Sequence, residues 1–441
     1  MKTNKGRNVK KFTFPAVIIA SFFIKLILMP FSAHSDLFAT QIFPPLLLEE
    51  KVIDIFGYLD NLGKSYFYPP LSYYLFAFFE YFLQNFSSTY LEWLNQMRLS
   101  YLNGLQGQAD VFLKAVQNPS LFFDIFLAKT PLLIFDVASL IVLFKFVKER
   151  VLKSEALYLW ILNPVIFYTT YIFGQFDIIV LFFILLGFYL IRKHIKLGIL
   201  AFGFAGALKS YPFIIVLPLI LIYGKDVKEK LKLLIIAFAP FVISIIPTLI
   251  NSPQLVLFTF FPKNIFHYKQ PLEGWEKYSQ FIKYGSQAFS YLLLLLISTF
   301  IKLKDKLRTS IGISLIVVLL ALTLAGRTHF HYLIWEMPLM ILWFRNNLKF
   351  LTVIILIQTI SFASYKILAS QLQLGLFAPI NPDYFMSLPT FNGLISQVIS
   401  YRIVSTFGFV VFTSVNILLI TKILFGLLFT SETKYTHLNV K

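Results

Sequence analysis

The sequence contains no cysteine among its 441 residues. This absence excludes disulfide bonds, zinc sites with cysteine ligands and thiol catalysis. Charge is also scarce, since Asp, Glu, Lys and Arg make up only 14% of the chain, and 21 acidic residues stand against 39 basic ones. With so few polar side chains, the protein cannot cover the surface of a soluble core.

Apolar side chains dominate instead. The chain is 58% hydrophobic and 18% aromatic, with a mean hydropathy of +0.74. Many apolar runs approach the roughly 20 residues that cross a bilayer. These features predict an all-α, polytopic membrane protein in which residues 1–441 form a single integral membrane domain. The net charge of +18 is assigned to cytoplasmic loops, so nucleic acid is not an expected partner.

Basic residues gather at every second boundary between apolar runs, which predicts an orientation. The first apolar run reaches about residue 31 and is too long for a cleaved signal peptide, so it is expected to be a retained helix. The pattern predicts about twelve transmembrane helices of a plasma (inner) membrane protein, with both termini cytoplasmic. On this assignment about 25 of the 39 basic residues are cytoplasmic.

Residues 32–120 are net acidic and are predicted to form a long first extracytoplasmic loop. Within this loop, the aromatic run from Tyr68 to about residue 82 is too short to span a bilayer and predicts a juxtamembrane helix in the interface. The polar segments 251–285 and 370–400 are predicted to be further outer loops.

Residues 197–223 could form one long helix, but that helix would place the basic loops at its two ends on opposite sides of the membrane. A hairpin of two short helices keeps both loops inside. Pro212, in the segment Lys209-Ser210-Tyr211-Pro212, supplies the break that a hairpin needs. The hairpin is the preferred interpretation.

Several polar residues that loop charge does not explain fall at or near the predicted outer face. They are His34, Asp36, Gln175, Asp177, Lys209, Arg327, His329 and His331. Ionisable groups at membrane depth are costly unless they are paired or line a wet cavity, so the set predicts a functional site. The alternative is that each is an ordinary interfacial loop residue. Asp136 and Glu336 lie deeper and are expected to be paired structural groups.

Asp36 follows the first apolar run directly and is the candidate catalytic residue. A carboxylate within reach of an attacking hydroxyl is a usual general base for glycosyl transfer. His34 could orient this carboxylate or bind the acceptor. The alternative is structural, since Asp is a favoured N-cap and Asp36 could cap a short helix that begins near Leu37.

The other candidates are predicted to bind substrate. Arg327 could hold a phosphate bidentately or could be a snorkelling arginine at a helix end. His329 and His331 could donate to a phosphate or a sugar hydroxyl, whereas their spacing makes a poor zinc motif, so no metal or other cofactor is expected. Lys209 could add positive charge or snorkel. Gln175 and Asp177 could bind sugar hydroxyls or belong to a simple turn.

Five short motifs follow one another in the order seen in prokaryotic GT-C glycosyltransferases, which the chain resembles over about residues 12–345. They are His34-x-Asp36, Tyr68-Pro69-Pro70-Leu71, Gly174-Gln175-x-Asp177, Leu208-Lys209-x-x-Pro212 and Arg327-Thr328-His329-Phe330-His331-Tyr332. The resemblance is to the branch with polyprenyl-phosphate-mannose-dependent mannosyltransferases and the PIG-M type. Residues 346–441 carry no recognised motif.

The resemblance implies an inverting glycosyltransferase that moves a sugar, such as mannose, from a polyprenyl-phosphate donor to a glycan or lipid acceptor among membrane lipids. Asp36 matches the family's catalytic acid, and Arg327 and His329 match its Arg-x-His motif. Two departures stand out. The family motif often continues His-Glu-Arg-Tyr where this chain has a histidine at 331, and the first loop has His-Ser-Asp instead of two acids.

Two rival functions share the expected topology. A glycan polymerase or ligase would also use outer-face Arg and His but would tolerate loss of Asp36. A transporter or flippase of lipid-linked substrates would show inverted repeats and an ionisable pair at the midplane. The sequence has no convincing internal repeat, and its candidate residues gather at one surface.

Overall fold

The computed structural model describes residues 5–64, 68–102, 115–257, 275–300, 305–324, 329–366 and 374–428. Within these ranges every regular element is a helix and there is no β-strand, so the predicted all-α fold is confirmed.

Five of the described segments are long and apolar enough to cross a membrane. They are α8 (Leu121–Lys148), the joined segment Ala156–Phe173, α19 (Lys306–Leu324), α21 (Leu348–Lys366) and α24 (Tyr401–Leu428). The joined segment consists of α9 (Ala156–Ile161), α10 (Pro164–Ile166) and the π-helix η1 (Phe167–Phe173). A sixth span results if α1 (Lys5–Phe31) and the bent helices after it count as one. The protein is therefore a multi-pass membrane protein, as predicted.

Shorter apolar helices occupy the positions of several other predicted crossings. They are α11 (Asp177–Leu190), α12 (Ile195–Leu208), α13 (Phe213–Tyr223) and the segment Gly285–Thr299 within α18 (Trp275–Phe300). The count of about twelve spans stays a prediction. The predicted break at residues 209–212 is confirmed, because α12 ends and α13 begins on either side of it.

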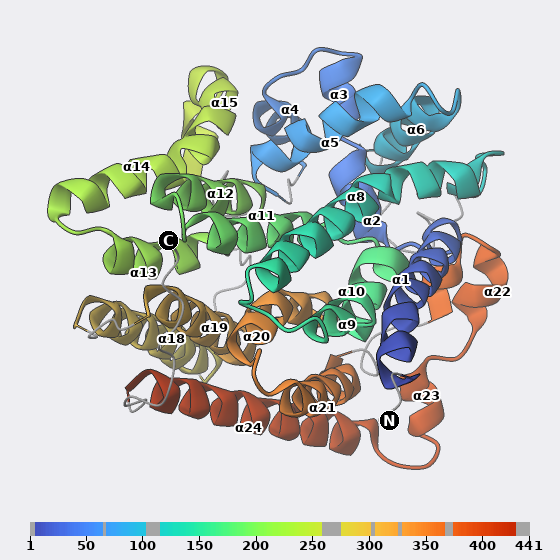
Figure 1. Ribbon diagram of the computed structural model, residues 1–441. Helices are drawn as coiled ribbons and strands as arrows, with labels where there is room; N and C mark the ends of the chain where they lie inside the picture. Colours follow the sequence, from blue (N-terminus) through green and yellow to red (C-terminus); the bar gives the residue numbers. More distant parts are fainter. Residues whose placement is uncertain are drawn as a thin grey trace.

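The helices of the predicted first outer loop gather at one end of the molecule (Figure 1). They are α2 (Ser35–Gln41), α3 (Pro44–Leu48), α4 (Ile55–Asn61), α5 (Pro70–Leu83) and α6 (Tyr90–Leu102). These helices share a small apolar core that includes Phe43, Tyr73 and Trp93. Helix α5 coincides with the predicted juxtamembrane helix.

The predicted outer loop at 251–285 is partly wrong. After α14 (Val227–Ser244), α15 (Ile246–Asn251) and η2 (Pro253–Leu255), helix α18 already begins at Trp275. The polar residues of this stretch led to a loop assignment, but a helix can extend beyond the apolar layer with polar side chains. In the predicted loop at 370–400, the described residues form η4 (Leu374–Phe377), α22 (Pro382–Ser387) and α23 (Phe391–Ile395).

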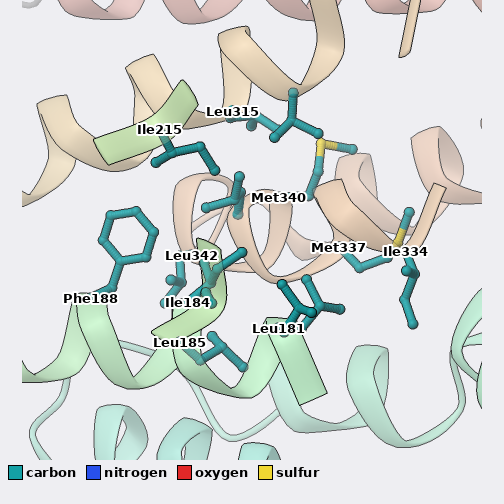
Figure 2. Packing of buried hydrophobic residues seen from close by; sticks show 14 of the residues in the cluster. Leu181, Ile184, Leu185, Phe188, Ile215, Leu315, Ile334, Met337, Met340 and Leu342 are labelled. Carbon is teal, nitrogen blue, oxygen red and sulfur yellow. The ribbon is translucent and has the colours of Figure 1, made fainter. Parts of the chain in front are cut away.

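The main apolar core joins α11, α13 and α19 to the 3₁₀-helix η3 (Phe330–Glu336) and to α20 (Met337–Trp343). Figure 2 shows Met340 and Leu342 of α20 between Ile184 of α11 on one side and Leu315 of α19 on the other. All four side chains are at most 2% exposed. This packing fixes η3, which carries His331.

Two deep acids have different partners. Asp136 pairs with Lys25 of α1 at 2.7 Å and also accepts hydrogen bonds from Trp160 and Tyr171, which confirms a paired structural role. Glu336 accepts a hydrogen bond from the amide of Gln358 at 3.3 Å, so its described hydrogen-bond partner is an amide and not a cation. Both acids are thus paired within the protein, Asp136 with a cation and Glu336 with an amide.

Helices α12 and α14 pack closely at Gly203, where an added Cβ would lie 2.2 Å from the carbonyl oxygen of Ala237. Small residues at such crossings let helix backbones approach one another in membranes. We therefore expect Gly203→Ala to lower the free energy of unfolding by about 1–3 kcal/mol, as overpacking usually does. Thermal unfolding in detergent measures this.

Gly285→Ala is the matched control, because an added Cβ there meets nothing within 4 Å. It should leave stability unchanged or slightly raised, since alanine is the better helix former. Equal melting temperatures for the two variants would show that the α12–α14 contact accommodates an added methyl group without loss of stability.

Candidate active site

Four chain segments that lie far apart in the sequence meet at the candidate site. They are the residues after α1, the turn between η1 and α11, the start of η3 and the break between α12 and α13 that carries Lys209. The backbone joins the first two, because His34 N–H donates to the carbonyl of Phe173 at 3.0 Å. The rings of the same two residues stack with centroids 3.9 Å apart. The third segment joins them through His331, whose ring centroid lies 5.1 Å from that of Phe173.

His34, not Asp36, is the N-cap of α2. The imidazole Nδ1 of His34 accepts a hydrogen bond from the backbone N–H of Asp36 at 3.1 Å, and α2 begins at Ser35. The structural alternative for Asp36 as an N-cap is therefore wrong. Asp36 lies in the first turn of α2, where its carboxylate is free of capping and 36% exposed.

The same Nδ1 of His34 lies 3.3 Å from Oδ1 of Asp36. A neutral Nδ1 has a lone pair and can accept from the backbone, whereas a protonated Nδ1 can only donate to the carboxylate. The two contacts therefore differ in whether Nδ1 carries a proton. Without a proton Nδ1 caps α2, and with a proton it donates to the carboxylate of Asp36.

Gln175 connects Asp36 to an aromatic residue of the first outer loop. Its buried amide Nε2 donates to Oδ2 of Asp36 at 3.2 Å and to the hydroxyl of Tyr68 at 3.3 Å. The turn that carries Gln175 depends on Gly174, whose φ of +85° lies in the left-handed region that favours glycine. The predicted Gly174–Asp177 turn thus delivers Gln175 to the carboxylate of Asp36.

Asp177 and Lys209 form an ion pair beside this group. Lys209 Nζ lies 2.8 and 3.0 Å from the two carboxylate oxygens of Asp177, and the indole N–H of Trp335 donates to the same carboxylate at 2.7 Å. Asp177 is fully buried. Both oxygens of Asp177 are therefore engaged within the protein, and much of the charge of Lys209 is balanced by this acid.

Aromatic rings surround the Lys209–Asp177 pair. The ammonium of Lys209 lies 5.3–5.7 Å from the ring centroids of Tyr68, Phe176, Tyr332 and Trp335. Trp335 stacks on Tyr332 on one side and on Tyr211 on the other. Since these rings cover both of its faces, Trp335 is part of a rigid wall and does not present a face for stacking a sugar.

The two histidines of η3 stand next to each other, with ring centroids 5.4 Å apart and nearly parallel planes. His331 is buried, whereas His329 is exposed. Burial and the neighbouring charge of Lys209 hold the pKa of His331 well below its usual value. His331 is therefore neutral at pH 7 and can donate or accept a hydrogen bond, while His329 faces outward from the cluster.

Asp36 has an unusually acidic carboxyl group. Burial alone would raise its pKa, but the hydrogen bond and charge of His34, with smaller contributions from His331 and His329, lower the pKa of Asp36 to about 2. His34 is the main source of this lowering, through its hydrogen bond to the carboxylate and through its charge. Asp36 is a carboxylate over the whole physiological range and can accept a proton or a hydrogen bond.

Seven of the eight predicted site residues lie in the described ranges, and the structure brings all seven into one cluster. Arg327 lies outside the described residues. Among the residues described, no three His, Asp or Glu side chains form a group suited to a metal ion. Sequence reasoning missed Trp335 as a member of the site, and it used Tyr68 and Tyr332 only as parts of motifs. The sequence does carry a signal for these aromatic residues, because they flank the candidate polar residues.

The Lys209–Asp177 pair yields a stability prediction. Lys209→Met leaves a buried carboxylate unpaired, which usually costs about 3–5 kcal/mol, so the variant should unfold at a much lower temperature. The double variant Lys209→Met/Asp177→Asn removes the charge as well and should recover most of the loss. A double variant no more stable than Lys209→Met would argue against the ion pair as the cause.

Similarity to known proteins shows an enzymatic function for the protein. Residues 115–333 match Glycosyltransferase family 87, and this segment contains five of the seven clustered residues but not His34 or Asp36. Among curated proteins, none matches the chain. The match spans just under half of the chain, and on its strength the protein is a glycosyltransferase that resembles family 87 in its central segment.

Proposed function

We propose that the protein is an inverting GT-C glycosyltransferase that takes a sugar from a polyprenyl-phosphate donor. The sugar is a hexose such as mannose, the acceptor is a glycan or a lipid, and transfer takes place on the extracytoplasmic face of the plasma membrane. The proposal includes about twelve spans with both termini in the cytoplasm.

One observation carries the proposal: the two acids of the cluster have opposite surroundings. Asp177 is fully buried and is held by Lys209 and Trp335, whereas the side chain of Asp36 is 36% exposed and its neighbours are His34 and Gln175. A general base must reach the proton that it removes. Only Asp36 meets this condition among the two, so Asp36 is assigned as the base and Asp177 as a structural acid.

The chemistry follows from this assignment. An acceptor hydroxyl attacks the anomeric carbon from the face opposite the phosphate, and the bond from that carbon to the phosphate oxygen breaks. The hydroxyl proton passes to Asp36, and the polyprenyl phosphate leaves with the bonding electron pair. His34 and Gln175 hold the carboxylate of Asp36 in place during the attack.

Phosphate binding is assigned to Arg327 and His329, which lie two positions apart. His329 is exposed at the edge of the cluster, and a guanidinium group binds phosphate bidentately. His331 is neutral and can donate to a sugar or phosphate oxygen. Lys209 is a weaker candidate for this role than the sequence predicts, because its ammonium is already paired with Asp177.

An apolar groove between α5, α12 and α14 supports a lipid-linked substrate. It has a volume of about 490 Å³ and is lined by Leu71 and Tyr74 of α5, Leu200 and Phe204 of α12, and residues of α14. Tyr68 lies two positions before α5, and Lys209 directly follows α12. A groove with an apolar lining suits the hydrocarbon tail of a prenyl chain.

Asp36→Asn tests the assignment of the base. Asparagine keeps the size of the side chain but cannot accept the proton, so transfer should fall by at least about 10²-fold while expression and membrane insertion are retained. The assay incubates purified protein with a panel of polyprenyl-phosphate sugars and follows consumption of the donor.

Asp383→Asn is the control for the loss of an acid. Asp383 is an exposed residue in the first turn of α22 and is not one of the clustered residues, so this variant should transfer at the wild-type rate. Substantial transfer by Asp36→Asn would remove Asp36 from the mechanism and would favour a glycan polymerase or ligase. Transport of an intact donor without its consumption would favour a flippase.

The low pKa of Asp36 gives a pH prediction. Loss of His34 removes the largest effect that opposes burial, so the pKa of Asp36 should rise and the base should be protonated at a higher pH. His34→Asn removes the imidazole but keeps a side chain that caps helices well. We expect the acidic limb of kcat/KM to move upward in this variant, as measured between pH 3 and 8. An unmoved limb would mean that His34 does not set this ionisation.

A further inference from the structure

Lys129 is a fully buried lysine in the membrane-spanning helix α8. Within the part of the chain that the structure describes, its hydrogen-bond partners are a hydroxyl and backbone carbonyls, with no carboxylate among them. A cation at membrane depth is costly to bury, so a lysine in this position calls for an explanation by function.

The contacts of Lys129 join the ends of two helices, α1 and η1. Its ammonium donates to the carbonyl of Ser32 at 2.5 Å and to that of Tyr171 at 2.6 Å, with the carbonyl of Ile172 at 3.4 Å. Ser32 directly follows α1, and the other two residues lie in the last turn of η1. The final carbonyls of a helix have no partner within it and carry partial negative charge, so one ammonium serves two helix ends at once.

These two ends lead directly into the active site. Ser32 precedes His34 and Asp36 by two and four positions, and Ile172 precedes Gln175 by three. Figure 1 shows α8 running past both α1 and the α9–α10 segment that leads into η1. The packing at this point is tight, since a Cβ added to Gly174 would lie 3.1 Å from Cε of Lys129 and 3.3 Å from Leu37.

We infer that Lys129 is a positioning residue that holds the loop of Asp36 against the turn of Gln175. The role of Asp36 in this inference rests on the proposed function. Lys129 does not touch the substrate. It fixes the distance between the base and the amide that orients it, and a shift of about 1 Å in such a pair can cost about 10²-fold in rate.

The test uses the absence of cysteine from the chain. Thr170 of η1 is fully buried and its hydroxyl has no hydrogen-bond partner, so Thr170→Cys places one protected thiol beside the contact at little cost. In this background, Lys129→Met should raise the rate of labelling by N-ethylmaleimide at least tenfold. With the donor that the wild-type protein consumes, kcat should fall by about 100-fold and KM should stay within about twofold.

The matched control is Lys25→Met/Asp136→Asn, which removes another buried lysine from the same region together with its partner acid. The oxygen of asparagine at 136 can accept from the indole N–H of Trp160, and its NH2 group can donate to the hydroxyl oxygen of Tyr171. This control should change neither labelling nor kcat by more than about twofold. Equal changes in both variants would overturn the inference, because Lys129 would then be one of several buried groups that only stabilise the fold.

Gly174→Ala is the second variant if Lys129→Met does not fold. It crowds Lys129 from the other side and strains the left-handed φ, and it should raise labelling and lower kcat in the same direction. Wild-type labelling and kcat in a folded Lys129→Met, or in Gly174→Ala where the former does not fold, would overturn the inference. Labelling does not depend on transfer, so an active Asp36→Asn would defeat the proposed function without deciding the role of Lys129.

Discussion

The contact between the end of α1 and the end of η1 determines the rest of the site. The backbone N–H of His34 donates to the carbonyl of Phe173 at 3.0 Å. The carbonyls of Ser32 and Tyr171 accept hydrogen bonds from the ammonium of Lys129. Without this contact, Asp36 and Gln175 would have no fixed distance, because they lie 139 positions apart in the chain. A polar contact of this kind is strong in a membrane protein because few other donors compete for the carbonyls.

The electrostatics of the cluster separate two acids that look alike in the sequence. Asp177 is buried with a cation and an indole N–H, which satisfy both of its oxygens. Asp36 is partly exposed, and its carboxyl pKa is lowered to about 2 beside His34. The first arrangement stabilises the fold, and the second keeps a carboxylate ionised and within reach of a substrate. On the proposed function, the first acid stabilises the site and the second acts in it.

Sequence reasoning predicted the features that depend on composition and local order. The all-α fold, the end of the first helix, the break before Pro212 and the α5 helix follow from apolar runs and proline chemistry, which are local. The gathering of His34, Asp36 and the later histidines followed from the side of the membrane on which loop charge placed them.

The sequence could not predict which residues far apart in the chain contact one another. Nothing local distinguishes Lys129 from any lysine near a helix end, and nothing in the order of residues links Asp177 to Lys209 and Trp335. The loop predicted up to residue 285 failed for a related reason, since a run of polar residues does not reveal whether a helix continues past the bilayer. These outcomes depend on tertiary packing, which a periodic pattern does not encode.

The central claim is that Asp36 takes the proton of the acceptor hydroxyl while the phosphate leaves from the opposite face of the sugar. The most direct measurement is a structure of the protein with a bound polyprenyl-phosphate sugar. The account predicts the carboxylate of Asp36 on the face of the sugar away from the phosphate, within hydrogen-bond reach of an acceptor oxygen. A sugar bound with Asp36 on the phosphate side, or with no path from Asp36 to its anomeric carbon, would contradict the account.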